Sequence, residues 1–309
     1  MRHFGIVGLF ALGVTFIEAT GALAQEWTFN SSLDFVYLNR GDVEGGLIEY
    51  TATGEPVLSG SDFDLGWVPG VDAQARVHND RWGAGVRYLG GFNWDDRVAV
   101  PITDFAIFLT EPALSVIPAD FSASYGSRLD SFEFNGMWMP SSRVTVLGGL
   151  RWVGIDDSLL VRGTSSVAVL DFNLSLESRG LGPQIGAEFR VIDPSEGGLP
   201  IFLDVDARIG AVYLSHDGAF IVGQPSLAPI FDSAGGASDW SFLGEVGAKI
   251  GAKVGERGSV TLGYRGVYLN RVPQAAGQYP GVDVLAGTME LSYDSFWSHG
   301  VTVGFEMNF

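Results

Sequence analysis

Apolar residues occupy every second position in the last ten residues of the chain, GVTVGFEMNF. Val301, Val303, Phe305, Met307 and Phe309 alternate there with small or polar residues. A period of two indicates an extended strand with one face in apolar surroundings and the other in polar ones. Because a chain end frays unless neighbours hold it, this pattern predicts a last strand that is firmly paired in a sheet.

The same period recurs along the chain from Trp27 onward. Short connections alternate with long ones, and an even number of strands places both chain ends on the side of the short connections. Within one long connection, Leu159–Val161 and Val167–Leu170 either extend two strands or form a further pair, which would make twelve. The ten expected strands have their apolar positions within residues 27–37, 63–77, 82–94, 132–138, 144–152, 181–191, 201–213, 240–254, 260–268 and 289–309.

Short turns on one side and long loops on the other are typical of a transmembrane β-barrel. A bilayer tolerates no open sheet edge, so such a sheet closes. A soluble β-sandwich also alternates, but the tryptophans of this chain fall on the apolar phase near strand ends, as in interfacial girdles. We therefore expect an all-β antiparallel barrel of about ten strands, with twelve as the alternative. The expected aromatic girdle is Trp27, Trp67, Trp82, Trp94, Trp138, Trp152, Trp240, Trp297 and Phe309.

The first 24 residues have the layout of a cleavable export signal. Arg2 and His3 precede the apolar run Phe4–Ile17, and Ala22–Ala24 supplies small residues before Gln25. The apolar run is too short to span a bilayer as a helix. We expect a signal peptide over residues 1–24, an outer-membrane barrel over residues 25–309, and a location in the outer membrane of a bacterium.

Charged residues are expected on the inward phase of the strands, in equal numbers of both signs. The formal net charge of −18 then resides mostly in the long loops, and it argues against a nucleic-acid partner, which requires a basic face. In a narrow barrel the inward charges either pair as a polar core or line a path for ions or solutes. The expected lumen-lining residues are Arg76, Arg87, Glu133, Arg151, Glu188, Asp204, Asp206, Arg208, Glu245, Lys249 and Arg265.

Several segments resemble one known family. Ser127–Leu159, Ser178–Val191 and Phe296–Phe309 are similar to segments of the Legionella-type pore-forming outer-membrane proteins and their planctomycete and proteobacterial relatives. The resemblance extends over roughly residues 61–309 and implies a bacterial outer-membrane barrel that forms a pore. In many such barrels the assembly machinery reads a terminal phenylalanine, which implies that role for Phe309. Outer-membrane lipids and lipopolysaccharide are the other expected partners.

Little in the sequence points to catalysis. The chain has no cysteine, which removes thiolate chemistry and cysteine metal sites, and no phosphate-binding GxxxxGK[ST] motif occurs. Asp95 and Asp96, with His216 and Asp217, are the material for a surface hydrolase. Adjacent strand residues point to opposite sides, so these four converge only if the backbone bends. We expect no enzymatic activity, no cofactor and no metal site, and we interpret the acid pairs as solvated loop charge.

Three functional hypotheses follow. The first is a narrow porin-like channel with a charge-balanced lumen. The second is a structural or adhesive surface barrel without a conducting pore. The third, a surface hydrolase, has the least support.

Overall fold

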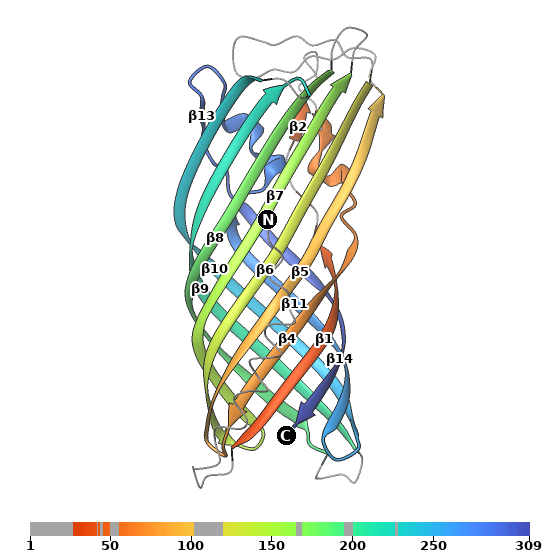
Figure 1. Cartoon of the computed structure of the whole chain (residues 1–309), viewed down its shortest axis with the longest axis vertical. Helices are drawn as coiled ribbons and strands as arrows, with labels where there is room; N and C mark the ends of the chain where they lie inside the picture. The colour runs from red at the N-terminus through yellow and green to blue at the C-terminus, as the bar shows by residue number, and fades with distance from the viewer. Residues whose placement is uncertain are drawn as a thin grey trace.

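The structure, a computed structural model, describes residues 27–41, 43, 46–49, 56–101, 120–164, 169–194, 200–225 and 228–309. Ten long strands pair antiparallel in chain order, and β1 pairs with β14 to close the sheet into a barrel (Figure 1). The barrel strands are β1 (Thr28–Arg40), β4 (Trp67–His78), β5 (Trp82–Pro101), β6 (Asp120–Ser141), β7 (Val144–Thr164), β8 (Val169–Ile192), β9 (Ile201–Gly223), β10 (Pro229–Val254), β11 (Gly258–Val272) and β14 (Asp294–Asn308).

The ten-stranded barrel is confirmed, and the alternative of twelve strands is wrong. Leu159–Val161 belongs to β7, and residues 169–170 begin β8, so this region lengthens two strands. The expected signal peptide lies outside the described residues. No helix in the described ranges is long and apolar enough to cross a membrane.

The short turns lie at one end of the barrel, together with the last residue, Phe309 (Figure 1). Among them are residues 79–81, 142–143 and 255–257. We call this the turn end and the opposite one the loop end. The backbone amide of Phe309 donates to the carbonyl of Phe29 at 2.8 Å, so the chain end is held in the sheet, as its alternation predicts.

Toward the turn end, the apolar side chains of each strand point outward. On β9, Ile209 and Tyr213 are 53% and 48% exposed. At ~3.3 Å per residue and a tilt of ~45°, the stretch from Ile201 to Tyr213 is roughly 28 Å tall, which is close to the ~25 Å apolar band of a membrane barrel. We call this outer surface the apolar belt.

Aromatic side chains border the apolar belt at both ends. Near the turn end, the rings of Trp82 and Trp138 lie 6.4 Å apart, centroid to centroid. Near the loop end, neighbouring strands carry pairs such as Tyr213 with Trp240, whose centroids are 5.4 Å apart. The outward and exposed members of the expected girdle are Trp27, Trp67, Trp82, Trp138, Trp152, Trp240, Trp297 and Phe309.

Trp94 does not belong to the girdle, which corrects the prediction. The register of β5 shifts between Gly90 and Phe92, and Gly91 has a φ of 80°, a left-handed conformation that glycine adopts at no steric cost. The extra residue of such a bulge turns the following side chains to the opposite face. Phe92 and Trp94 consequently point inward and are 0% exposed, and the indole nitrogen of Trp94 donates to the carbonyl of Leu38 at 3.3 Å.

Beyond the loop-end aromatic residues, β5–β10 continue and their polarity reverses. On β9, Leu214 and Phe220 point inward and are 0% exposed, whereas Ser215 and Asp217 face outward. We call this part of β5–β10 the extension. The sequence pattern predicts long loops around residues 95–124, 156–178 and 215–238. Within these ranges, residues 95–101, 120–124, 156–164, 169–178, 215–223 and 229–238 lie in strands. The period of two persists there, but the apolar phase changes faces.

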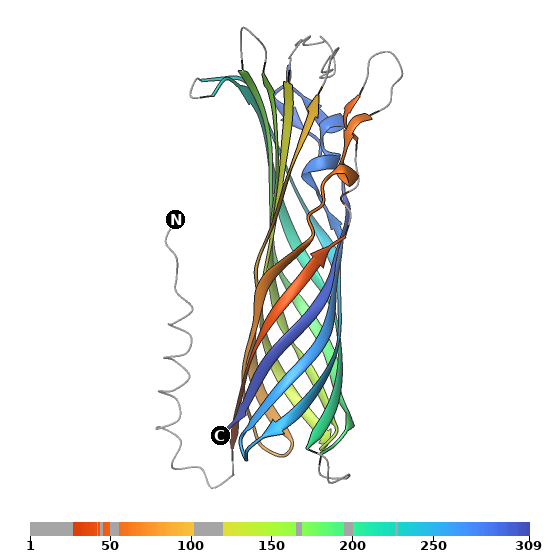
Figure 2. The same ribbon diagram turned by 90° about the vertical axis from the view of Figure 1, so that its right-hand side faces the viewer.

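The remaining strands, β1, β4, β11 and β14, end near the loop-end aromatic residues (Figure 2). Two chain segments cover the apolar interior of the extension on that side. One, residues 273–293, contains η2 (Ala275–Gly277), η3 (Tyr279–Gly281), β12 (Val282–Asp283) and β13 (Thr288–Met289); we call it the inner segment. The other contains β3 (Pro56–Ser59), which pairs with β2 (Gly46–Glu49), and η1 (Gly60–Asp62).

These segments correct two expected strand boundaries. Met289, expected at the start of the last strand, lies in β13 and is buried, and β14 begins only at Asp294. Phe63 and Leu65, expected in the second strand, precede β4 and are buried in the apolar core. Their apolar alternation reflects burial inside the extension and not contact with a membrane.

Candidate functional site: the interior of the barrel

All of the expected lumen-lining residues point into the barrel at the level of the apolar belt. They come from β4 to β11, one or more from each strand, because alternate positions of a strand share a face. Most of them line one cavity, and Glu133, Arg151 and Glu245 pack against that set through ion pairs.

Four arginines and four carboxylates form a compact cluster across the interior, which we call the ionic layer. Arg87 makes a two-point contact with Asp72, through Nε and Nη2 at 2.8 Å each, and its Nη1 donates to Glu133 at 2.9 Å. A two-point contact of this kind fixes geometry as well as charge. The members of the ionic layer are Arg87, Arg151, Arg208, Arg265, Asp72, Glu133, Asp206 and Glu245.

Glu245 is the centre of the ionic layer. Its carboxylate contacts Arg87 at 2.7 Å and Arg151 at 2.6 Å, and it also pairs with Arg265. Its side chain is 0% exposed, and those of Arg87 and Arg151 are 2% and 1% exposed. Burying such charges is tolerable only when each is paired and hydrogen-bonded, and here every carboxylate has more than one cationic neighbour.

Neutral side chains complete the hydrogen bonding of Glu133. Gln184 donates to its Oε2 at 2.7 Å and Asn135 at 2.9 Å. The hydroxyl of Ser131 accepts a hydrogen bond from Nε of Arg151 at 2.8 Å. The charges of the ionic layer are therefore paired, and low local dielectric strengthens each bond. Three buried atoms in and beside it, Nε of Arg208, Nε of Arg265 and Oε1 of Gln184, have no hydrogen-bond partner among the described residues.

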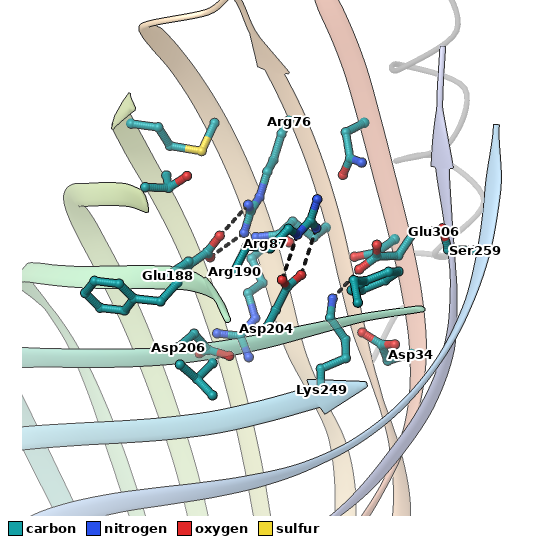
Figure 3. Close-up of a pocket in the computed structure, with 18 of the residues that line it drawn as sticks. Asp34, Arg76, Arg87, Glu188, Arg190, Asp204, Asp206, Lys249, Ser259 and Glu306 are labelled. Carbon is teal, nitrogen blue, oxygen red and sulfur yellow. Dashed lines mark hydrogen bonds and ion pairs between the residues drawn. The ribbon is translucent and has the colours of Figure 1, made fainter. Parts of the chain in front are cut away.

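A cavity of about 350 Å³ lies on the turn-end side of the ionic layer (Figure 3). We call it the cup. Arg76 donates two hydrogen bonds to Glu188, of 2.6 and 2.5 Å, and Arg190 donates two to Asp204, of 2.9 Å each. Lys249 on β10 pairs with Glu306 on β14 (Figure 3). These side chains are partly exposed, so the cup is a polar recess that ends at the ionic layer.

On the loop-end side of the ionic layer the interior is a continuous apolar core. The side chains in it come from the barrel wall and from the two covering segments. Among the fully buried ones are Leu38, Phe92, Trp94, Leu214, Phe220, Leu243, Leu269, Ala275, Ala276 and Phe296. Two regions along the barrel axis therefore exclude water: the buried centre of the ionic layer and, directly beyond it, the apolar core.

A buried ion pair ties the inner segment to the barrel wall. Arg40 contacts Asp157 at 3.0 Å and Oε1 of Gln274 at 3.2 Å, and the amide of Ala275 donates to Asp157 at 3.3 Å. Arg40 also lies over the ring of Tyr125, 5.4 Å from its centroid. Burial raises the pKa of Asp157, although the nearby guanidinium opposes this. The sequence gives no signal for these contacts, because they join segments far apart in the chain.

The residues considered for a hydrolase do not converge. Asp95 and Asp217 face outward on β5 and β9, which three strands separate. Asp96 accepts a hydrogen bond from the amide of Asp64 at 2.8 Å. His216 is buried, 1% exposed, and its Nδ1 lies 2.8 Å from the hydroxyl of Ser178.

The acidic pairs do not gather into a metal site either. Asp156 faces outward and pairs with Arg179 at 2.6 Å, whereas Asp157 faces inward to Arg40. Within the described ranges, no three His, Asp or Glu side chains are grouped as metal ligands. Asp95 and Asp96 likewise point to opposite faces of β5, as strand geometry requires.

A comparison with protein-family models finds no match, and a comparison with curated proteins finds none either. The resemblance to the Legionella-type proteins therefore stays a prediction. Solved barrels are similar in architecture. The outer membrane protease OmpT from Escherichia coli is 8% identical with a TM-score of 0.48, covering 94% of this chain and 99% of its own.

Two further solved barrels are similar at lower scores. The translocator domain of autotransporter NalP from Neisseria meningitidis is 11% identical with a TM-score of 0.40, covering 98% and 95% of the two chains. The toluene transporter TbuX from Ralstonia pickettii is 10% identical with a TM-score of 0.32, covering 94% and 91%. None of these similarities identifies an activity.

Proposed function

We propose that the chain spans a bacterial outer membrane as a closed barrel and presents its extension at the cell surface. The roughly 28 Å apolar belt and its two aromatic borders support the membrane location, since indole and phenol rings favour the headgroup level. The export signal expected at residues 1–24 supplies the route. The polar outside of the extension suits a part that stands in water.

One observation carries the choice between a pore and a closed barrel: solvent from the cup reaches Asp206 and Arg265, which are 18% and 13% exposed, but it does not reach the centre of the ionic layer. A channel needs a continuous water-accessible path, and its lining side chains are exposed along it. Arg87, Arg151 and Glu245 are exposed by 2% or less, and an apolar core follows. A structural or adhesive surface barrel is thus favoured over the porin-like channel that the sequence suggests first.

Phe309 fits a role in assembly, and we include that role in the proposal. Its ring is 52% exposed at the turn end, beside Phe29 at a centroid distance of 5.6 Å. The last strand, β14, pairs with both β1 and β11. A terminal aromatic residue that stays accessible while its strand closes the sheet is available to an assembly factor during insertion.

Single-channel recording in a planar bilayer tests the closed interior. The wild-type barrel should insert and give no current steps, while an open porin reconstituted in parallel gives them. The Arg151→Ala variant extends the test, because it removes a cation from the ionic layer. Stepwise current in the wild type whose ion selectivity changes in Arg151→Ala would establish a channel through the ionic layer and overturn the closed barrel.

A further inference from the structure

A hollow of about 470 Å³ indents the outer wall of the extension across β5–β9. Its floor is made of small outward residues: Gly126, Ser158, Ser175 and Ala219 lie side by side on β6, β7, β8 and β9. Below the floor runs a row of larger polar side chains. In register across the strands, this row is Asn93, Arg128, Asp156, Glu177 and Asp217.

The hollow lies just above the apolar belt. The next outward position below Asp156 on β7 is Gly154, and the one after it is Trp152, whose neighbours in register are Phe132 and Leu181. These aromatic and apolar side chains mark the loop-end border of the belt. In a bilayer that surrounds the belt, the hollow consequently faces the headgroups of the outer leaflet.

An exposed indole lies on the same wall, just below the residues that line the hollow. Trp152 is 36% exposed and leans along the wall over Gly154: a Cβ atom at Gly154 would lie 2.7 Å from the indole Cη2 and 3.3 Å from Cδ of Arg179. Only glycine leaves this space. The indole of Trp152 thereby lies against the wall over Gly154, between the apolar belt and the polar row.

The polar row offers groups that bind hydroxyls. The side chains of Asp156 and Glu177 are 44% and 58% exposed, and Arg179 holds both, at 2.6 and 3.2 Å. Fixing these carboxylates in one geometry lowers the entropy lost when a ligand accepts or donates hydrogen bonds there. Arg128, which is 54% exposed, lies beside Asp156 in the row and pairs with Asp130 at 2.8 Å.

We propose that this hollow binds the saccharide headgroup of a membrane glycolipid. Carboxylates, an amide and serine hydroxyls accept from and donate to sugar hydroxyls, and an exposed indole offers an apolar face for the C–H side of a sugar ring. A bare phosphate suits the site poorly, because three outward carboxylates line it and both nearby arginines, Arg128 and Arg179, are already paired with carboxylates. The inference rests on the proposed membrane location, since the headgroup must reach the hollow from the bilayer.

The test uses the full-length mature barrel, refolded into phosphatidylcholine vesicles that contain a minor fraction of rough-type lipopolysaccharide. The barrel is re-extracted in mild detergent, and the glycolipid that remains bound is measured by native mass spectrometry. The double variant Glu177→Gln, Asp217→Asn should retain about tenfold less, because a neutral amide oxygen accepts hydrogen bonds from sugar hydroxyls more weakly than a carboxylate does. Asp232→Asn, on the outer face of β10 away from the hollow, should retain as much as the wild type.

A second pair of variants tests the indole. Trp152→Leu should lose retention, and Trp240→Leu, which removes a girdle tryptophan outside the hollow, should not. Equal retention by hollow variants and their controls would overturn the proposal. Equal retention of phosphatidylglycerol, an anionic lipid without a saccharide, would overturn the choice of ligand class.

Resistance of the barrel to carbonate extraction from the same vesicles separates the two proposals. An inserted barrel that retains no glycolipid refutes glycolipid binding at the hollow and leaves the proposed membrane location intact. A barrel that carbonate releases refutes the membrane location itself.

Discussion

Nη1 of Arg151 donates to Oε2 of Glu245 at 2.6 Å, and solvent reaches neither side chain. Arg151 lies on β7 and Glu245 on β10, so the bond crosses the interior over two intervening strands. The same carboxylate pairs with arginines of β5, β9 and β11. Through these ion pairs Glu245, on β10, is linked to β5, β7, β9 and β11. The ionic layer therefore holds strands together and also blocks the interior.

Removing one partner of this pair should destabilise the barrel strongly. Glu245→Ala leaves buried arginines without their shared counter-charge, and breaking a buried pair costs about 3–5 kcal/mol. Urea unfolding in lipid vesicles, followed by tryptophan fluorescence, measures the loss. Arg162→Ala is the matched control, because its pair with Asp171 is on the outer face of the extension and exposed pairs contribute little. Equal losses in both variants would show that the ionic layer carries no special stability.

The bulge in β5 should depend on glycine at position 91. Gly91→Val places a β-branched residue at a φ of 80°, a conformation that costs a side-chain-bearing residue about 1–2 kcal/mol or more. A Cβ at Gly91 has no atom within 4 Å, so the loss reflects backbone strain and not a clash. Urea unfolding measures it, with Gly277→Ala as a control at a position whose φ is not left-handed. An unchanged stability in Gly91→Val would contradict the bulge.

His216 should make the stability of the extension sensitive to mild acid. Burial lowers the pKa of His216, with Asp239 and Asp217 opposing and Arg271 adding to the shift. The unfolded chain then binds a proton near pH 6.5, before the folded one does. The contribution of His216 to stability is constant above about pH 6.5 and falls as the pH drops from there toward the folded pKa, by up to about 1.4 kcal/mol per pH unit.

Unfolding of the wild type at several pH values between neutral and mildly acidic measures this slope. His216→Gln should flatten it, while His78→Gln, at the turn end, should leave it unchanged. A slope of the same size in all three proteins would assign the acid sensitivity to other groups.

The pair of Arg40 and Asp157 should hold the inner segment in place. Asp157→Ala removes the acceptor of the Ala275 amide and leaves Arg40 buried without its partner. Losing about 1–3 kcal/mol of local stability should speed amide exchange in residues 273–281 by about tenfold or more. Hydrogen exchange with mass spectrometry resolves this segment from the strands. Exchange that accelerates equally in β9 and β10 would mean global destabilisation and would contradict a local clamp.

The alternation of the chain was sufficient to predict ten strands and their inward charges. It could do so because the lipid is apolar and the interior at this level is polar. Each strand therefore alternates apolar outward residues with polar inward ones. On β9, for example, Ile209 faces out and Arg208 faces in, as the pattern requires. The same logic predicted the outward direction of the tryptophans other than Trp94.

Longer strands were considered only for Leu159–Val161 and Val167–Leu170, and the rest of the extension was missed because the two environments exchange sides there. Above Tyr213 the outside is water and the inside is apolar, so Leu214 and Phe220 carry the opposite phase from Ile209. A strand prediction that follows the outward apolar positions therefore ends each strand at the loop-end border of the apolar belt. Trp94 was misplaced for a related reason, since one extra residue at Gly91 changes the phase within a strand.

The sealing of the interior could not be predicted from sequence. Balanced charges at inward positions are equally compatible with a lined path and a paired core, and only the distances among Arg87, Glu133 and Glu245 distinguish the two. The inner segment reads as a polar and glycine-containing loop, although it packs Ala275 and Ala276 at 0% exposure. The position of the inner segment depends on contacts with residues far away in the sequence, and the local alternation of apolar residues contains no information about them.

Quenching of tryptophan fluorescence by lipids brominated at known depths tests the central claim most directly. Single-tryptophan variants that keep only Trp138, Trp152 or Trp94 are refolded into such vesicles. The account predicts strong quenching of Trp138 and Trp152 by bromine near the headgroups, at opposite borders of the bilayer, and almost none of Trp94 at any depth. Quenching of Trp94 equal to that of Trp152, or none of Trp138 and Trp152, would contradict a closed barrel that is apolar outside at the belt and apolar inside above it.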